Sequence, residues 1–267
     1  MAKPDGNPPD PMQSARRMAR PELQKRFYKR AEMHEEQGVF TLRLDGRPAR
    51  TPARNPLAVR DPRLAAAIAA EWNAQSEHID AAVMPVTRLA NTALDGVAAR
   101  PQEVRDDILG YAGTDLLCYR ASEPEGLVAR QRAAWDPIVA WAERRFGGRV
   151  VLAEGVMHVP QPHATLAAIA AELAAIDDPF RLAGLHLATN LSGSALIALA
   201  LAEGAIDTEA AWAAAHVDED WNISQWGADA EAMQRRARRF ADFSAAALAL
   251  APVLTSSERG GRGCATF

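Results

Sequence analysis

Proline and glycine divide the chain after about Asp80 into segments that each have helical periodicity. Pro101 and Pro179 stand where proline suits the first turn of a helix, whereas Pro137 lies inside a helical pattern and predicts a kink or a division. We expect helices at residues 85–96, 101–112, 124–146, 162–175, 179–203, 208–226 and 228–250, with a short ribbon of RVVLA (149–153) and VMHVP (156–160) between two of them. Residues 81–252 therefore predict a helical domain, an orthogonal-type bundle.

The residues before this helical series have a different period. VFTLRL, residues 39–44, alternates in the manner of a strand, and Asp45-Gly46 then offers a two-residue hairpin turn. Asp61 and Pro62 are suited to begin a helix, and one face of that helix is apolar, formed by Leu64, Ile68 and Trp72. Residues 26–80 therefore predict a small α+β domain with a hairpin, which precedes the helical domain.

Both ends of the chain have a composition unsuited to a packed core. Residues 1–25 are rich in Pro, Asp and Arg, and residues 253–267 are polar and Gly-rich. Such segments cannot bury enough apolar surface to offset the loss of conformational entropy, so both predict disordered tails.

Charge and hydropathy exclude several classes of protein. A net charge of −4 from interspersed acids and bases does not suit a nucleic-acid binder. The most apolar stretch, residues 182–202, is interrupted by polar residues and predicts a buried helix, so no membrane insertion is expected. Cys118 and Cys264 give no disulfide framework, and the N-terminus lacks a signal-peptide core. We therefore expect a bacterial-type cytoplasmic protein.

The sequence is poor in catalytic residue patterns. His216 and Asp220, four residues apart on one expected helix, could hold a metal with Glu219 nearby, but no third ligand follows at a recognisable spacing. Cys118 lies among apolar residues, which is typical of a buried thiol. Without a phosphate loop or a metal motif, we expect a binding protein with no cofactor and no metal, not an enzyme. The alternative is a metal-dependent or small-molecule hydrolase that uses His216, Glu219 and Asp220.

Three consecutive acids interrupt an otherwise apolar helical pattern in VDEDWNISQWGADAEA, residues 217–232. Glu219 falls in the middle of a stripe that comprises Trp212, His216, Glu219, Ile223 and Trp226, whereas Asp218 and Asp220 are turned about 100° to either side and can reach solvent. Val217 and Trp221 belong to a second apolar face, expected against the bundle. A carboxylate in this stripe needs a partner.

Three interpretations of Glu219 follow from this pattern. It pairs within the chain with an arginine of the next helix, at position 235, 236, 238 or 239; it meets a basic group on a partner protein; or it takes part in catalysis or metal binding. The pattern of residues alone leaves all three open.

A segment in the middle of the chain resembles a known family. TDLLCYRASEPEGLVARQRAAWDPIVAWAERRFG, residues 114–147, is similar to the hallmark segment of the assembly chaperone for the α subunit of the F-type ATP synthase, found in mitochondria and α-proteobacteria. The similarity extends over about residues 26–250, and its most specific residues are Thr114-Asp115, Cys118-Tyr119-Arg120, Glu123-Pro124, Gln131, Trp135-Asp136-Pro137, Trp141 and Arg145.

The resemblance implies a chaperone without enzymatic activity. Members of the family bind the free α subunit and cover the surface that later meets the β subunit. In bacteria this implies the cytoplasm, and in eukaryotic relatives the mitochondrial matrix. The family also has an important acidic residue just before its WG motif. Here that implies a partner-binding role for Glu219, with Asp218 and Asp220 as adjacent candidates and with Gln225 and Trp226 of the motif beside them.

Overall fold

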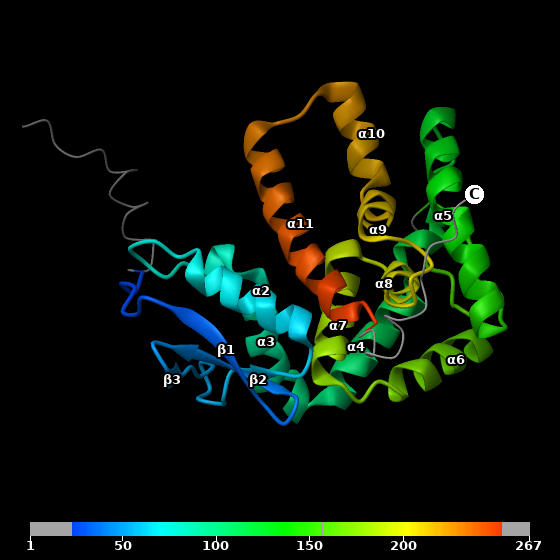
Figure 1. The fold of residues 1–267 in the computed structure, drawn as a ribbon. Helices are drawn as coiled ribbons and strands as arrows, with labels where there is room; N and C mark the ends of the chain where they lie inside the picture. The colour runs from blue at the N-terminus through cyan, green and yellow to red at the C-terminus, as the bar shows by residue number, and fades with distance from the viewer. Residues whose placement is uncertain (1–22, 156, 253–267) are drawn as a thin grey trace, which may run out of the picture.

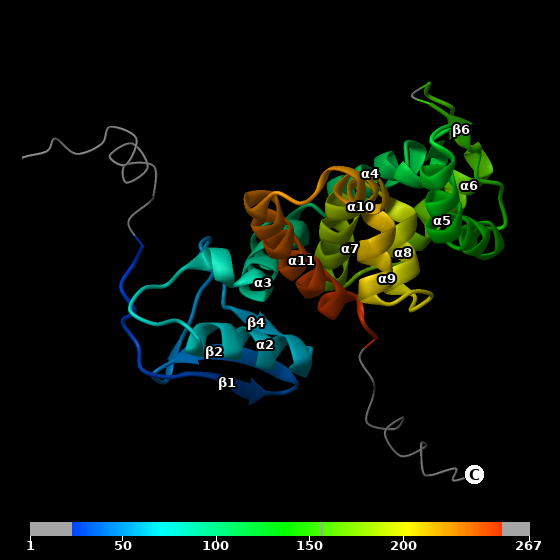
Figure 2. The ribbon, with the colours of Figure 1, turned by 90° about the horizontal axis from the view of Figure 1, so that it is seen from above.

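The computed structural model describes residues 23–155 and 157–252, and it has a small strand-containing part followed by a mainly helical part (Figure 1). The tails predicted at 1–25 and 253–267 lie outside these residues, apart from 23–25. Lys25 forms an antiparallel bridge with His78, so this end of the described chain is joined to the strand-containing part. Seen from above, α3 (Pro85–Asp95) and α11 (Ala230–Leu250) lie between the sheet, with the helix that covers it, and the other helices (Figure 2).

The sheet is built on the predicted hairpin. Strands β1 (Ala31–Glu36) and β2 (Val39–Leu44) are antiparallel, and both β3 (Arg47–Pro48) and β4 (Ala58–Val59) pair with β2. Asp45 and Gly46 form the turn between β2 and β3 with φ of +49° and +81°, a backbone conformation that Asp-Gly adopts readily. Local turn chemistry therefore fixes the register of these strands.

Helix α2 (Pro62–Asn73) covers the sheet with the predicted apolar face. The Asp61 carboxylate accepts a hydrogen bond from the backbone amide of Arg63, and Pro62 occupies the first turn, as the sequence indicates. Leu64 and Ile68 are buried, together with Leu42 of β2 below them. Burial of these side chains stabilises the contact between helix and sheet, since each contributes about 1.5–3 kcal/mol when fully removed from water.

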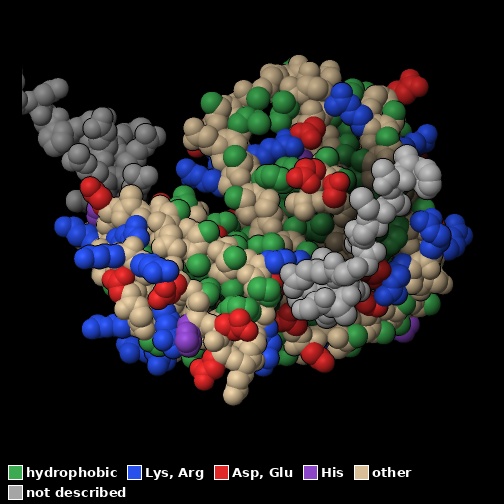
Figure 3. All heavy atoms as spheres, in the orientation of Figure 1, with side chains coloured by type: hydrophobic (Ala, Val, Ile, Leu, Met, Phe, Trp, Pro, Cys, Tyr) green, Lys and Arg blue, Asp and Glu red, His purple; other side chains and the backbone are tan. Residues whose placement is uncertain are grey.

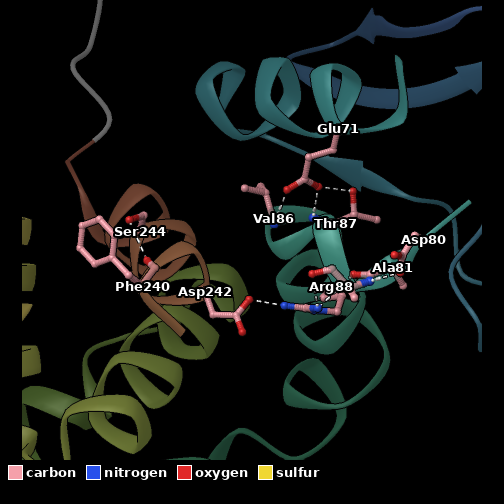
Figure 4. A network of polar contacts seen from close by, with 10 residues as sticks. Glu71, Asp80, Ala81, Val86, Thr87, Arg88, Phe240, Asp242 and Ser244 are labelled. Atoms are coloured by element: carbon pink, nitrogen blue, oxygen red, sulfur yellow. Dashed lines mark hydrogen bonds and ion pairs between the residues drawn. The ribbon is translucent and has the colours of Figure 1, made fainter. Parts of the chain in front are cut away.

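Glu71 of α2 begins the next helix, α3 (Pro85–Asp95). Its carboxylate accepts hydrogen bonds from the backbone amides of Val86 and Thr87, each 2.7 Å long, and from the Thr87 hydroxyl at 2.6 Å (Figure 4). A negative charge at a helix N-terminus is favourable because it satisfies free amides and meets the positive end of the helix dipole. From α3, Arg88 then pairs with Asp242 of α11, which joins the strand-containing part to the last helix.

Residues 97–252 are mainly helical, and α7 and α8 form their buried centre. The 3₁₀ turns are η1 (Ala81–Val83), η2 (Val97–Ala99) and η3 (Leu116–Cys118). The α-helices are α4 (Pro101–Gly113), α5 (Glu125–Phe146), α6 (His163–Ala174), α7 (Pro179–Ser192), α8 (Ala195–Ala202), α9 (Thr208–Ala215), α10 (Val217–Trp226) and α11 (Ala230–Leu250). No helix among the described residues is both long and apolar enough to cross a membrane.

The single helix predicted at 179–203 is wrong, because the chain breaks between α7 and α8. Gly193 has φ of +71°, a left-handed conformation that ends α7, and the Ser194 side chain accepts a hydrogen bond from the Ile197 amide to begin α8. Gly followed by Ser is the usual signal for such a break, but the continuous apolar pattern hid it.

Two further expectations concern the middle of the chain. Of the kink or division predicted at Pro137, the division is wrong, because α5 continues through this residue. The ribbon expected between 149–153 and 156–160 is wrong. Instead, β6 (Ala153–Glu154) pairs in parallel with β5 (Tyr119–Arg120), which belongs to the hallmark segment.

Asp115 of the hallmark segment is fully buried at the break between α7 and α8. Its carboxylate accepts hydrogen bonds from the Ser194 hydroxyl at 2.6 Å and from the backbone amides of Leu196 and Leu117, each at 3.0 Å. Burial raises the pKa of Asp115 to about 6, and the hydrogen bonds only partly oppose this shift. The same carboxylate therefore caps both η3 and α8.

The raised pKa predicts a specific dependence of stability on pH. Because Asp115 has a pKa of about 6 when folded and about 3.9 when unfolded, folding favours its protonated form. Its contribution to stability is fully present below pH 4 and is lost as pH rises through 6. The free energy of unfolding of the wild type, measured relative to Asp115→Asn by urea titration, should fall by about 2 kcal/mol between pH 4 and pH 7. A difference independent of pH would contradict the assignment.

Trp135 of α5 fills the core between α5 and the α9–α10 junction. The side chain is 1% exposed, its Nε1 donates a hydrogen bond of 2.7 Å to the Ala214 carbonyl, and the Arg120 guanidinium lies over the ring. Ile138 packs in the same core and is buried. One side chain of the hallmark segment thus fixes the position of two later helices.

Truncating Trp135 should destabilise the whole protein. Trp135→Ala removes a fully buried aromatic ring and leaves the Ala214 carbonyl without its partner, so we expect the free energy of unfolding to fall by about 3–5 kcal/mol. Chemical denaturation measures this directly, with Trp226→Ala as the matched control because that tryptophan is 86% exposed. Equal stability of the two variants would contradict this packing.

Candidate partner-binding surface

The helix predicted at 208–226 is divided at His216, so the expected continuous stripe from Trp212 to Trp226 is wrong. His216 has φ of −121° and ψ of +21°, outside helical geometry, and it separates α9 from α10. Its ring is buried, stacks 3.8 Å from the Trp212 ring centre, and shares a hydrogen bond of 2.8 Å with the Trp212 carbonyl through Nδ1. His216 therefore packs as part of the core, and α10 points in a new direction.

Helix α10 is held against the start of α5 by its apolar face, as the sequence predicts. Val217 is buried, and Trp221 lies against Gly126, where only a residue without a side chain fits. Arg130 of α5 also contacts Trp221, with its guanidinium 4.9 Å from the centre of the indole ring. A cation near an indole face strengthens such a contact by about 0.5–1 kcal/mol when exposed.

Asp218 is engaged within the chain. Its Oδ1 accepts a hydrogen bond of 2.8 Å from Nε2 of Gln131, and the Gln131 Oε1 in turn accepts one from the Ala121 amide at 2.8 Å. Gln131 is buried and belongs to the hallmark segment. Asp218 is exposed, as expected, and its carboxylate in addition positions α10 on α5.

Asp220 also has an internal partner, whereas Glu219 has only distant ones. Asp220 pairs directly with Arg236 of α11, and this hydrogen bond raises the pKa of the guanidinium. The Glu219 Oε2 lies 3.9 Å from Nη1 of Arg236 and 3.9 Å from Nε2 of His216, beyond hydrogen-bond distance. Of the arginines considered as internal partners, Arg236 is the one that approaches Glu219, and Asp220 already neutralises it.

The surroundings of Glu219 leave its charge available at the surface. Its side chain is 44% exposed, and burial lowers the pKa of His216, so the nearest imidazole is neutral at pH 7. A cavity of about 580 Å³ lies beside it, lined also by Tyr119, Asn190 and Arg239. In the space-filling view, acidic and basic side chains lie next to one another over α10 and α11 (Figure 3).

The end of α10 presents apolar surface next to these charges. Trp226 and Gln225 are exposed, and so is Met233 at the beginning of α11. The two helices form a hairpin that extends away from the buried centre (Figure 1). Large exposed tryptophan and methionine side chains are typical of protein interaction sites.

The residues of the hydrolase alternative do not form a metal-binding or nucleophilic site. Within residues 23–155 and 157–252, no three His, Cys, Asp or Glu side chains are grouped so that they could hold a metal ion. The Asp220 carboxylate is taken up by Arg236, and the His216 ring is buried. Burial, with the nearby Asp115, raises the pKa of Cys118 to about 12, so its thiol stays protonated at neutral pH.

Known proteins share this fold and sequence. Residues 25–143 match the model of the ATP12 chaperone protein family. The crystal structure of a candidate chaperone from Agrobacterium tumefaciens is 50% identical in sequence, has a TM-score of 0.81, and covers 91% of each chain. Atp12 from Paracoccus denitrificans is 39% identical with a TM-score of 0.77 over 85% of this chain and 97% of that chain. A variant of it with lysine in place of an aspartate matches equally well.

The fold and the sequence together define a chaperone, that is, a protein that acts by binding other proteins. The chain belongs to the ATP12 chaperone family, which confirms the resemblance found in the hallmark segment. Residues of that segment, among them Asp115, Gln131 and Trp135, hold the core together and position α10.

Enlarging Gly126 should loosen α10 while leaving the rest of the fold intact. A Cβ atom at Gly126 would lie 2.6 Å from Cη2 of Trp221, closer than such atoms approach, so Trp221 must move. We expect Gly126→Ala to lower the free energy of unfolding by about 1–3 kcal/mol and to speed hydrogen exchange of the α10 amides. Gly110→Ala in α4 is the control, since its Cβ would meet no atom within 4 Å. Equal exchange in both variants would contradict the docking role of Trp221.

Proposed function

We propose that this chain binds the free α subunit of the F-type ATP synthase and shields the surface that later meets the β subunit. An isolated subunit of an oligomer exposes an interface far larger than the apolar patches that a monomer tolerates, so it needs temporary cover. Membership of the ATP12 chaperone family is shown, and the proposal adds the identity of one partner protein. It places the protein in the bacterial cytoplasm, with no cofactor of its own.

We propose that α10 carries part of this interface, with Glu219 facing a basic group of the α subunit. The observation that supports this most is the difference between the three acids: Asp218 and Asp220 are held by Gln131 and Arg236, whereas Glu219 makes no hydrogen bond with any residue that the structure describes. Exposed Gln225 and Trp226 lie on the same helix and would add contact area. Charged groups of this kind contribute specificity without the very high affinity that would prevent release.

Charge reversal at Glu219 tests this role. Glu219→Lys should abolish the ability to keep the α subunit soluble on co-expression, because it places like charges together. The melting temperature should change little, since exposed pairs contribute about 0–1 kcal/mol. Glu219→Gln, which removes the charge without reversing it, should retain part of the activity. Asp218→Lys and Asp220→Lys should instead lower the melting temperature, because both carboxylates have partners within the chain.

The matched control is Glu35→Lys, which makes the same change of charge at an exposed position of β1. It should leave solubilisation unchanged. Full solubilising activity of Glu219→Lys would contradict the partner-binding role of Glu219. A large drop in the melting temperature of this variant would also contradict it, because it would indicate that Glu219 acts through Arg236.

A further inference from the structure

A second surface, unrelated to α10, lies at the edge of the N-terminal sheet. A groove with a volume of about 700 Å³ separates the segment before β1 from β3 and the end of α2. Apolar side chains form much of its lining, namely Phe27, Tyr28, Leu44, Pro48, Trp72 and Ile79. Phe27 is 64% exposed and stacks edge-on against buried Tyr28 at 5.5 Å. We refer to this feature as the Phe27 groove.

The border of the Phe27 groove carries two arginines and one aspartate. Arg47 and Arg50 line it, and in the described part of the chain neither forms an ion pair. Asp45 is the acid among the described lining residues, and the backbone amides of Lys29 and Arg30 hold its carboxylate and lower its pKa. Asp45 therefore stays ionised and faces backbone amides, and the two guanidinium groups leave the charged lining of the groove with a net charge of +1.

The same imbalance extends over the segment that forms the four strands of the sheet. Residues 23–60 contain nine Lys and Arg against four Asp and Glu, a net charge of +5, whereas residues 61–252 contain 15 against 26, a net charge of −11. Lys and Arg side chains are numerous over the strand-containing part in the space-filling view (Figure 3). A chain with an overall charge of −4 thus concentrates positive charge on the segment that forms the strands and one side of the groove.

We propose that the Phe27 groove binds an extended acidic segment of the client protein, one that carries aromatic or aliphatic side chains between its acids. Such a segment places apolar side chains on Phe27 and Trp72 and carboxylates against Arg47 and Arg50. This inference rests on the proposed function, because it takes the occupant from the client. It adds a second contact of opposite charge to the acidic contact of α10.

The chain's own N-terminal segment is the competing occupant, because the described residues begin beside the groove. Its sequence argues against that role, since residues 1–22 carry a net charge of +1 and include Arg16, Arg17 and Arg20 near the point of attachment. These would meet Arg47 and Arg50 with like charge. Charge complementarity therefore favours an acidic segment from another protein.

Titration of the full chain with a synthetic peptide tests the groove. The probe is a seven-residue peptide with glutamate at odd positions and phenylalanine or leucine at even positions. A control peptide of the same pattern has lysine in place of glutamate. Calorimetry should detect binding of the acidic peptide only. Affinity should weaken about ten-fold in Arg47→Glu/Arg50→Glu, and likewise in Phe27→Ser, and should fall as salt is raised. Arg132→Glu/Arg238→Glu, exposed on α5 and α11, is the matched control and should bind as the wild type does.

Every other result overturns the inference. Equal binding of both peptides indicates apolar adhesion without charge recognition, and equal weakening in the control variant indicates a general charge effect. A chain without residues 2–22 should bind the acidic peptide with unchanged affinity; binding about ten-fold tighter would identify those residues as the occupant. Because the titration contains no α subunit, it can fail while Glu219→Lys still loses solubilisation, and the two proposals are therefore tested apart.

Discussion

The buried carboxylate of Asp115 is the interaction on which the arrangement of the helices most depends. It caps the beginning of η3 and the beginning of α8 at the same time, so the hallmark segment and the central helices are positioned by one group. Burying a carboxylate is costly unless hydrogen bonds replace its water, and here a hydroxyl and two amides do so. The Leu116 amide adds a hydrogen bond of 3.2 Å to the Gly193 carbonyl, which ties the same two segments together through their backbones.

The hallmark segment connects the Asp115 site to α10 through a series of side-chain contacts. Arg120 donates to the Leu117 carbonyl at 2.8 Å and pairs with Asp136 at 2.7 Å, so the segment folds back on α5. Gln131 and Trp135 of α5 then reach Asp218 and the Ala214 carbonyl on either side of the His216 break. The segment that resembles the family most is therefore the support of the candidate surface, while the exposed residues of that surface lie about 85 positions later in the chain.

Much of the fold could be predicted where the signal is local. The Asp45-Gly46 turn, the Asp61 cap and the prolines at the start of helices act over a few residues, and the structure has each of them. Two breaks were missed because the apolar pattern continues across them. Gly193-Ser194 carried a usable signal, whereas at His216 the change of direction depends on stacking with Trp212, which no local rule reveals.

The position of the candidate surface could be found from the sequence, but not which of its three acids has a partner within the chain. Three acids near a WG pair are visible at once, yet which of them is free depends on Gln131, 87 positions before Asp218, and on Arg236 of the next helix. The Phe27 groove was missed altogether. Its arginines are spread through a hairpin, and only the folded sheet gathers them around Phe27 and Trp72.

Helix α11 links the two parts of the molecule mechanically. With 21 residues it is about 30 Å long, and a helix of that length behaves as a stiff rod. Arg236 near its beginning holds α10, and Asp242 in its middle pairs with Arg88 of α3. At its end, the Leu250 carbonyl accepts a hydrogen bond of 2.8 Å from Arg181, and the Ala251 carbonyl accepts one of 2.8 Å from Arg63 of α2. A tilt of α11 imposed at its α10 end would therefore also move its contacts with α2 and α3. A force on the α10–α11 hairpin would in this way reach the helix that covers the sheet.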